Sequence, residues 1–290
     1  RAGWPAQAEI PLLLPLLLLA IALTLLTLPL AFQRNLLFPA PKKNAVLASS
    51  SHRIEEFAIP VGGRSLRAYL ASPIDAPARP SSLLYFNGRR EHPTSIFRCL
   101  GQMPDQHLLC FHYEKLGPSL RKPDEARLVA DGVAMLDWLS ATLGLDPSEL
   151  AIAGRSLGSG IAIQVCALRP VRRLVLVSPY ARLIEPVRAA LPLMREWMLK
   201  DQFRSVEHIE RVTCPTLLVL GERDQTVPAA ASRRLFRAWP GELSECSIAH
   251  SGHRGLLKRP EVQRAIAEFC RPDSSDRHAP GHVRTAETAA

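Results

Sequence analysis

The chain lacks several patterns that would point to a metal, a nucleotide or a nucleic acid. Its Cys residues form no C-x-x-C pair and no Cys/His cluster with the spacing of a metal-ligand set, which argues against a metal site. Gly158-Ser159-Gly160 is not followed by the Lys of a phosphate-binding loop, so no cofactor is expected. Aromatic residues make up only 6% of the chain and are not interleaved with a basic stripe, so the net charge of +9 predicts no nucleic-acid partner.

The composition is that of a folded protein. At 290 residues, 47% hydrophobic and 22% charged, the chain is neither intrinsically disordered nor a coiled coil, and it is long enough for one large domain. Its six Cys allow 15 pairings that the sequence cannot choose between, and we interpret them as buried free thiols.

The first forty residues contain a long apolar run. Ile10 to Phe32 is 23 residues without a charge, and a helix of that length would measure about 34 Å against a hydrocarbon core of about 30 Å. The run is too long for the apolar core of a signal peptide, the competing interpretation. We therefore predict a single-pass membrane anchor at residues 1–33, with the membrane side left open, and a linker at 34–52.

The body alternates between strand-like and helix-like segments. Continuous apolar runs at 82–87, 107–113, 150–154, 173–179 and 216–221 predict strands buried on both faces, separated by helical stretches such as 124–144. Before them, 53–60 and 65–72 predict an antiparallel hairpin with a Gly-rich turn. The pattern predicts an α/β fold at 53–270 with a mostly parallel, doubly wound sheet.

Two further segments interrupt or end this rhythm. Residues 180–212 are richer in Leu, Met and Trp than a connecting loop needs. They are either an ordinary sheet-covering helix with a long approach or a short lid inserted over an apolar substrate groove. Residues 271–290 are polar, contain Pro and have no periodicity, which predicts a disordered tail.

The chemistry is predicted to lie at a serine between a strand and a helix. Gly154-Arg155-Ser156-Leu157-Gly158 is a G-x-S-x-G pentad with an apolar strand before it and a helix after it. Glycines on both sides let the chain turn sharply and let a substrate approach the hydroxyl. The helix that follows directs its positive end at the place where an oxyanion would develop.

A serine nucleophile needs a base and an orienting carboxylate, and two later loops supply candidates. Asp224 follows the apolar strand 216–221, and His253 lies in a loop between a strand-like and a helix-like segment. Glu222 and His250 are the rival carboxylate and base, each nearer the end of its strand. The order Ser156, Asp224, His253, each after its own strand, favours a Ser-His-Asp triad.

These residues resemble the alpha/beta-hydrolase family, and more narrowly its membrane-anchored serine hydrolase branch, over about 240 of the 290 residues. The resemblance is carried by Phe32 to Pro39 (FQRNLLFP), Tyr85-Phe86-Asn87-Gly88, Gly154-Arg155-Ser156-Leu157-Gly158, Ser178-Pro179-Tyr180, Cys214-Pro215-Thr216, Gly221-Glu222-Arg223-Asp224 and Ser251-Gly252-His253.

The resemblance implies the alpha/beta-hydrolase fold and a role for each site residue. Ser156 would be the nucleophile, His253 the general base and then acid, and Asp224 its orienting partner. The oxyanion hole would use the backbone N–H groups of Leu157 and Arg89. The family's usual His-Gly is Asn87-Gly88 here, which leaves backbone donors in place, and the following Arg89-Arg90 pair would either stabilise an anion or be solvated charge.

The function predicted from these features is a membrane-anchored serine esterase or thioesterase acting on a small acyl or lipid-like ester. A serine peptidase on the same fold is the first alternative, because fold-level analogy does not separate esters from amides. The second is a catalytically silent, membrane-tethered binding protein, which the complete triad disfavours. The natural substrate and the oligomeric state are left open.

Overall fold

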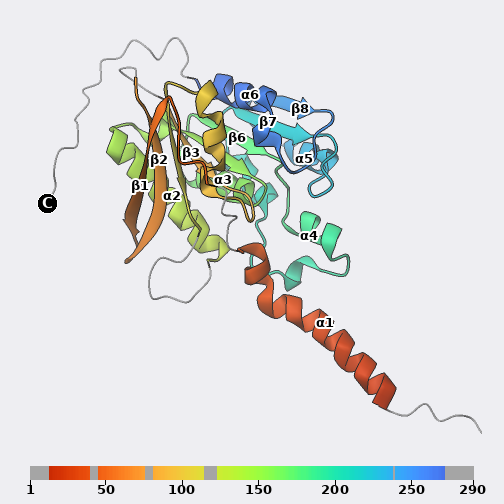
Figure 1. Ribbon diagram of the computed structural model, residues 1–290. Coiled ribbons are helices and arrows are strands. Elements are labelled where there is room, and N and C mark those ends of the chain that lie inside the picture. The colour runs from red at the N-terminus through yellow and green to blue at the C-terminus, as the bar shows by residue number, and fades with distance from the viewer. Residues whose placement is uncertain (1–12, 40–44, 76–80, 114–122, 238, 272–290) are drawn as a thin grey trace, which may run out of the picture.

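The computed structural model describes residues 13–39, 45–75, 81–113, 123–237 and 239–271, and an eight-stranded sheet forms its centre (Figure 1). The strand order is β1-β2-β4-β3-β5-β6-β7-β8. β1 pairs with β2 and β2 with β4 in antiparallel fashion, and all other pairs are parallel. The predicted mostly parallel sheet with an N-terminal hairpin is therefore confirmed. The strands are β1 His52–Val61, β2 Arg64–Pro73, β3 Ser81–Phe86, β4 Gln106–Phe111, β5 Ala151–Arg155, β6 Arg173–Val177, β7 Thr216–Gly221 and β8 Leu243–Ile248.

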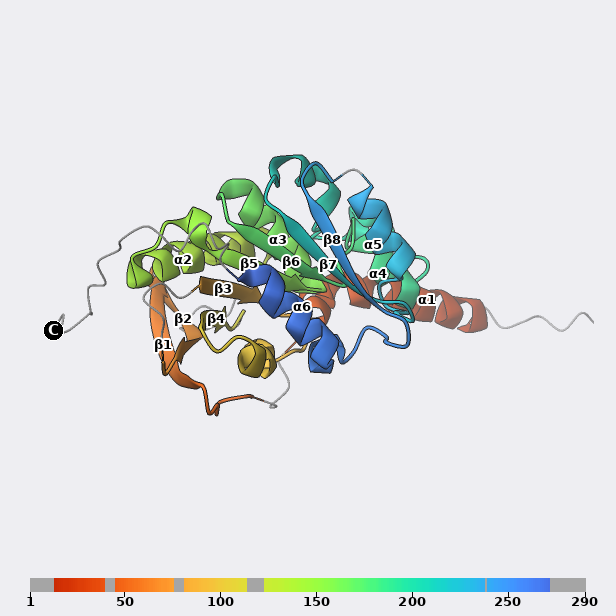
Figure 2. The ribbon, with the colours of Figure 1, turned by 90° about the horizontal axis from the view of Figure 1, so that it is seen from above.

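Helices cover both faces of the sheet (Figure 2). α2 (Glu125–Leu143) and α3 (Leu157–Leu168) lie on one face, while α6 (Pro260–Cys270) and the 3-10 helix η1 (Pro93–Gln102) lie on the other. β3 shows why its apolar run is continuous: Leu84 and Phe86 belong to the core beneath α2 and α3, whereas Leu83 and Tyr85 belong to the core beneath η1 and α6. Because successive side chains of a strand point to opposite faces, a strand between two cores is apolar at consecutive positions, as β3 is from Leu83 to Phe86.

Local sequence signals set the ends of these elements. The side chain of Asp124 accepts a hydrogen bond from the backbone N–H of Arg127 and caps the first turn of α2. Gly144 ends the same helix at φ 66°, the left-handed conformation common at helix C-termini. The predicted Gly-rich turn of the hairpin also holds, since Gly62 and Gly63 both have positive φ between β1 and β2.

The segment at residues 180–212 contains one short helix, α4 (Ile184–Ala190), and the 3-10 turns η3 (Glu196–Met198), η4 (Ser205–Glu207) and η5 (Ile209–Arg211). Part of its apolar surface is buried in the core, as at Met194 and Leu199, but Leu193 and Trp197 are 83% and 78% exposed. The segment is tied to the start of α2, because the Glu125 carboxylate accepts hydrogen bonds from the backbone N–H groups of Gln202 and Phe203, at 2.8 and 2.9 Å.

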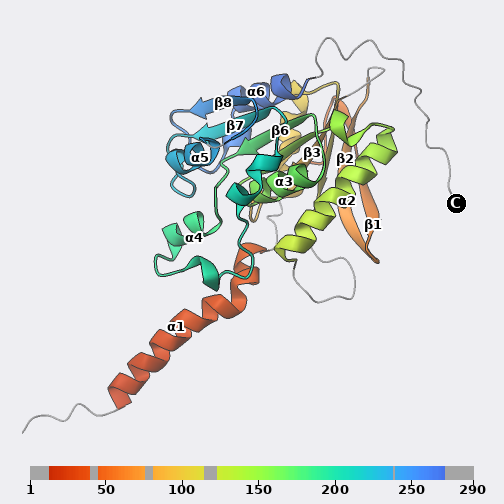
Figure 3. The ribbon, with the colours of Figure 1, turned by 180° about the vertical axis from the view of Figure 1, so that it is seen from behind.

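The apolar run at the start of the chain corresponds to helix α1 (Leu13–Leu37), which extends away from the sheet (Figure 3). The predicted transmembrane span, and with it the single-pass membrane location, is contradicted: within the described residues, no helix has the length and hydropathy that crossing a bilayer requires. The polar end of α1 instead bonds to the body. Arg34 donates two hydrogen bonds to Asp201, at 2.8 and 3.0 Å, and Gln33 donates to the carbonyl of Met198.

All six Cys are free thiols, but the prediction that they are buried holds only in part, because Cys214 and Cys246 are half-buried. Four are buried, and burial raises the pKa of both Cys99 and Cys270 to about 12. Such thiols pack as small apolar side chains. The predicted tail lies outside the described residues from 272 onward.

Candidate active site

The predicted nucleophile lies on a sharp turn between β5 and α3. Ser156 has φ 50° and ψ −117°, a conformation that non-Gly residues rarely adopt. The two glycines of the pentad are required because a larger residue at either position would clash with neighbouring backbone atoms. A Cβ at Gly154 would lie 2.5 Å from the carbonyl oxygen of Gly158, and one at Gly158 would lie 2.1 Å from that of Phe86. The pentad therefore lets the start of α3 pack against the end of β3.

The turn lies at the carboxyl end of β5, an interior strand of the sheet. β3 and β5 are parallel neighbours, with Phe86 in register with Gly154. The chain leaves β3 toward β4 on one side, whereas it leaves β5 toward β6 on the other. Loops that diverge in this way form a crevice at the carboxyl ends of the strands, where α/β proteins bind ligands. The loop after β3 and the turn at Ser156 both follow the carboxyl ends of these two neighbouring strands.

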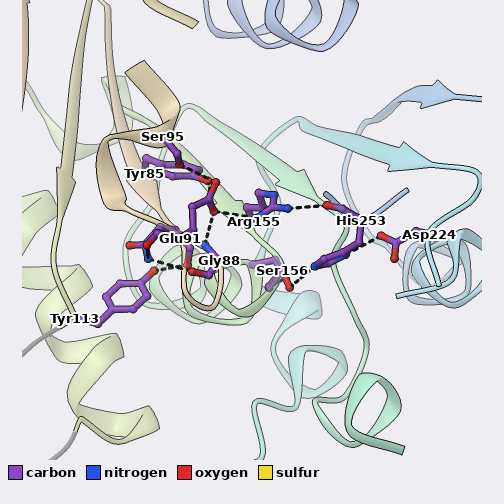
Figure 4. A network of polar contacts seen from close by, with 11 residues as sticks. Tyr85, Gly88, Glu91, Ser95, Tyr113, Arg155, Ser156, Asp224 and His253 are labelled. Carbon is purple, nitrogen blue, oxygen red and sulfur yellow. Dashed lines mark hydrogen bonds and ion pairs between the residues drawn. The ribbon is translucent and has the colours of Figure 1, made fainter. Parts of the chain in front are cut away.

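The structure brings the three predicted side chains into contact (Figure 4). His253 Nε2 lies 3.0 Å from Ser156 Oγ, and His253 Nδ1 lies 2.8 Å from Asp224 Oδ2. Asp224 is only 5% exposed, while Ser156 and His253 are half-buried. An ionised carboxylate can only accept, so Asp224 fixes the proton of a neutral imidazole on Nδ1 and leaves Nε2 free to accept from the hydroxyl.

The surroundings of Asp224 keep it ionised. Burial would raise its pKa, but the hydrogen bond from His253, the electrostatic interaction with that imidazole and the backbone N–H of Val227 outweigh burial and hold the pKa below its usual value. Its second oxygen, Oδ1, accepts from the backbone N–H groups of Thr226 and Val227, at 2.9 and 2.8 Å. These bonds fix the carboxylate plane and thereby the direction in which it holds the imidazole.

Glu222 and His250, the rival carboxylate and base, lie outside the contacts that join Ser156, His253 and Asp224. Glu222 forms an exposed ion pair with Arg233, and hydrogen bonds from Arg233 and Ser247 lower the pKa of Glu222 to about 2. His250 is exposed at the turn after β8. Within the described part of the chain, no group of three or more His, Cys, Asp or Glu side chains could hold a metal ion.

The two predicted oxyanion donors lie in different elements, one at the start of α3 and one in the loop after β3. Leu157 is the first residue of α3, where backbone N–H groups have no acceptor within the helix. Arg89 is exposed in the loop after β3, and its Nε donates to the carbonyl of Leu36 at the end of α1, at 2.6 Å. The preceding N–H, that of Gly88, is already bonded to Glu91 Oε2 at 2.8 Å. Arg89 and Leu157 remain predictions as oxyanion donors.

The sequence analysis missed an ion pair beside the triad. Arg155, the residue before Ser156, donates from Nη1 to Glu91 Oε2 at 3.0 Å, and both side chains are nearly buried. Each is a single charge in a loop or at a strand end, and such residues are usually solvated. The one available signal is position, because Glu91 follows β3 and Arg155 adjoins the serine of the pentad.

No protein-family model matches the chain. The chain is similar in sequence to several curated proteins. The uncharacterized protein Rv2307c of Mycobacterium tuberculosis is 39% identical over 45% of this chain and 47% of its own length. Alpha/beta hydrolase domain-containing protein aho-3 of Caenorhabditis elegans is 27% identical over 56% and 48%. Lysophosphatidylserine lipase ABHD12 of Macaca fascicularis is 25% identical over 64% and 55%. The chain thus spans about half the length of the curated relatives it matches.

The fold is also that of solved structures. The esterase PF2001 of Pyrococcus furiosus superimposes with a TM-score of 0.62 over 80% of this chain and 97% of its own, at 14% identity. Similarity at this level of identity shows the shared fold.

Proposed function

We propose that this chain, which belongs to the alpha/beta-hydrolase family, is a serine hydrolase that cleaves ester or thioester bonds by acyl transfer. One observation carries the proposal: His253 contacts the Ser156 hydroxyl through Nε2 and the Asp224 carboxylate through Nδ1. This is the arrangement that activates a serine, because the base is within reach of the proton and is itself oriented.

The proposed reaction has two halves. The Ser156 oxygen attacks the carbonyl carbon of the substrate while His253 Nε2 takes the hydroxyl proton, which His253 then gives to the departing alcohol or thiol. In the second half water replaces serine: His253 takes a proton from water, the resulting hydroxide attacks the acyl-enzyme, and the proton returns to Ser156. Asp224 stabilises the imidazolium formed in each half, while Leu157 and Arg89 donate backbone hydrogen bonds to each oxyanion.

For the substrate, we propose a small acyl or lipid-like ester. The exposed Leu193 and Trp197 of the segment at 180–212 would offer apolar contact to an acyl chain, which supports the interpretation of this segment as a short lid. One relative of the chain is named a lysophosphatidylserine lipase, which is consistent with an ester of this kind.

The test is covalent labelling with a fluorophosphonate, which reacts only with an activated serine, combined with hydrolysis of p-nitrophenyl esters of increasing acyl length. We expect the wild-type protein to be labelled and Ser156→Ala to remain unlabelled. His253→Ala should lose most of its labelling rate, while His250→Ala, which changes an exposed histidine outside the triad, should keep it. Equal labelling of both histidine variants would refute the assignment of the base, and cleavage of matched anilides but not esters would favour a peptidase.

A further inference from the structure

The Glu91–Arg155 ion pair joins three loops that the proposed reaction needs (Figure 4). Arg155 ends β5 immediately before Ser156, and Glu91 lies in the loop after β3. The two side chains are 11% and 14% exposed, and Nη1 to Oε2 is 3.0 Å. The other arm of the guanidinium, Nη2, donates to the backbone carbonyl of His253 at 2.6 Å. One side chain therefore contacts both the loop after β3 and the loop that holds the base.

The Glu91 carboxylate in turn organises the loop after β3. Oε2 accepts from the Gly88 N–H at 2.8 Å and from the Tyr85 hydroxyl at 3.1 Å, and Oε1 accepts from Ser95 Oγ at 2.7 Å. The loop also closes on itself, since the Glu91 N–H donates to the carbonyl of Gly88. The Gly88 N–H is engaged, and the next N–H of the turn is that of Arg89, the predicted donor to the oxyanion.

The loop after β3 contains a residue with an unfavourable backbone conformation, which its contacts hold in place. Arg90 has φ 60°, the left-handed region that costs a non-Gly residue of order 1 kcal/mol or more. The Asn87 side chain donates to the carbonyl of Glu91 at 3.1 Å, and the Tyr113 hydroxyl donates to the carbonyl of Asn87 at 3.0 Å. The surrounding contacts thus determine the loop geometry, and the carboxylate of Glu91 is the centre of those contacts.

The positive charge of Arg155 offsets the negative charge of Glu91 beside the predicted oxyanion donors. A lone carboxylate beside the oxyanion donors would oppose the negative charge that develops in the transition state. Burial lowers the pKa of Arg155, but the charge and hydrogen bond of Glu91, together with the charges of Tyr85 and Asp224, outweigh burial and raise the pKa. The guanidinium therefore stays positive and neutralises the carboxylate. Since a buried ion pair is a weak contributor to stability compared with apolar packing, its contacts to the loops of the site indicate a role in positioning.

We infer that Glu91 and Arg155 are a positioning pair, which holds the oxyanion loop and the His253 backbone in place around Ser156 while leaving no net charge beside the oxyanion. The inference rests on the proposed hydrolase function. Neither residue takes part in bond making, so both act through the backbone groups they hold.

The test compares four variants in the full chain: Arg155→Gln, Arg155→Lys, Glu91→Gln and the double variant Glu91→Gln/Arg155→Gln. Arg155→Gln leaves the carboxylate uncompensated, and we expect kcat for a p-nitrophenyl ester to fall about 100-fold with KM nearly unchanged. Glu91→Gln should lose less, because the amide oxygen still accepts from the Gly88 N–H. The double variant should exceed Arg155→Gln in kcat by about tenfold, because neither charge is left alone.

Arg155→Lys separates the effect of the positive charge from the effect of the guanidinium's hydrogen bonds. It also replaces Arg155→Gln in the test if that variant does not fold. An ammonium keeps the charge but lacks the fork that contacts Glu91 and His253 together, so we expect kcat to lie between those of the wild type and Arg155→Gln. Arg233→Gln, which breaks the exposed pair with Glu222, is the matched control and should leave kcat unchanged.

Two sets of results are distinguishable. If the wild type is neither labelled nor active, the proposed function fails and the inference fails with it. If the wild type is active but folded Arg155→Lys or Arg155→Gln keeps wild-type kcat, or the double variant shows only the product of the two single losses, the positioning role alone is overturned.

Discussion

Substituting Gly158 with Ala tests the packing of the nucleophile turn directly. Gly158 is the second residue of α3, and a Cβ there would lie 2.1 Å from the carbonyl oxygen of Phe86 and 2.8 Å from that of Asn87. Both are backbone atoms at the end of β3, so no side chain can rotate away to make room. The start of α3 and the oxyanion loop must therefore separate.

The size of this separation follows from the distances. Ordinary contact begins at 3.4 Å, so the shortest contact must lengthen by 3.4 minus 2.1, or 1.3 Å. Overpacking of this kind costs about 1–3 kcal/mol, which the better helix propensity of Ala offsets by up to about 1 kcal/mol. Activity has no such compensation: displacing one side of an active site by about 1 Å costs on the order of 100-fold in rate.

The assay is the rate of fluorophosphonate labelling, followed beside the thermal unfolding of the same samples. We expect Gly158→Ala to label about 100-fold more slowly and to lose about 0–3 kcal/mol of stability, the difference between the overpacking cost and the propensity gain. Gly101→Ala is the control, because a Cβ at Gly101 meets no atom within 4 Å. A Gly158→Ala protein that labels at the wild-type rate would refute the described packing of α3 against β3.

Two further predictions concern charge. Asp224→Asn should lower the labelling rate by about 10³- to 10⁴-fold with little change in fold, because an amide no longer holds the proton of His253 on Nδ1. A loss below tenfold would contradict the role given to Asp224. Burial lowers the pKa of His107 and His112 to about 4, whereas an unfolded His has a pKa of about 6.5. Between these values the unfolded chain binds protons that the folded protein does not, so the free energy of unfolding should fall as pH decreases from about 6.5 to about 4. Urea unfolding at several pH values checks this, and His112→Gln should show a smaller fall than the wild type; an equal fall would contradict the assignment.

Much of the fold is predictable from the sequence because its strands lie between two cores. The run Leu217 to Leu220 has four large apolar side chains in succession, all buried, which a half-exposed strand would not have. β8 shows the limit: it is an edge strand with mostly exposed side chains, and its sequence, LSECSI, is only weakly strand-like. The 3-10 helix η1 has no long periodic pattern, and only the tertiary contacts of residues such as Ile96 and Phe97 explain its place.

The site is predictable in its order along the chain but not in its supporting contacts. A pentad with a strand before it and a helix after it places Ser156, and loops after strands place Asp224 and His253. Glu91 and Arg155 are 64 residues apart, and neither position is apolar, periodic or part of a paired pattern. Their pairing depends on β3 and β5 being neighbours, which only the folded sheet shows.

The apolar run of α1 shows a different limit. Hydropathy describes how a segment partitions between water and lipid, but it does not show what the polar residues at its end contact. Gln33 and Arg34 end the run, and their hydrogen bonds to Met198 and Asp201 belong to the packing of the body.

The positions of the three site residues along the chain also determine when the site can form during synthesis. His253 follows the last strand of the sheet, 97 residues after Ser156, and α6 packs behind it only when the chain has been extended to residue 270. On a ribosome, Ser156 is translated 97 residues before its base. The nascent protein therefore carries a serine hydroxyl without its base until His253 has been translated and has joined the fold.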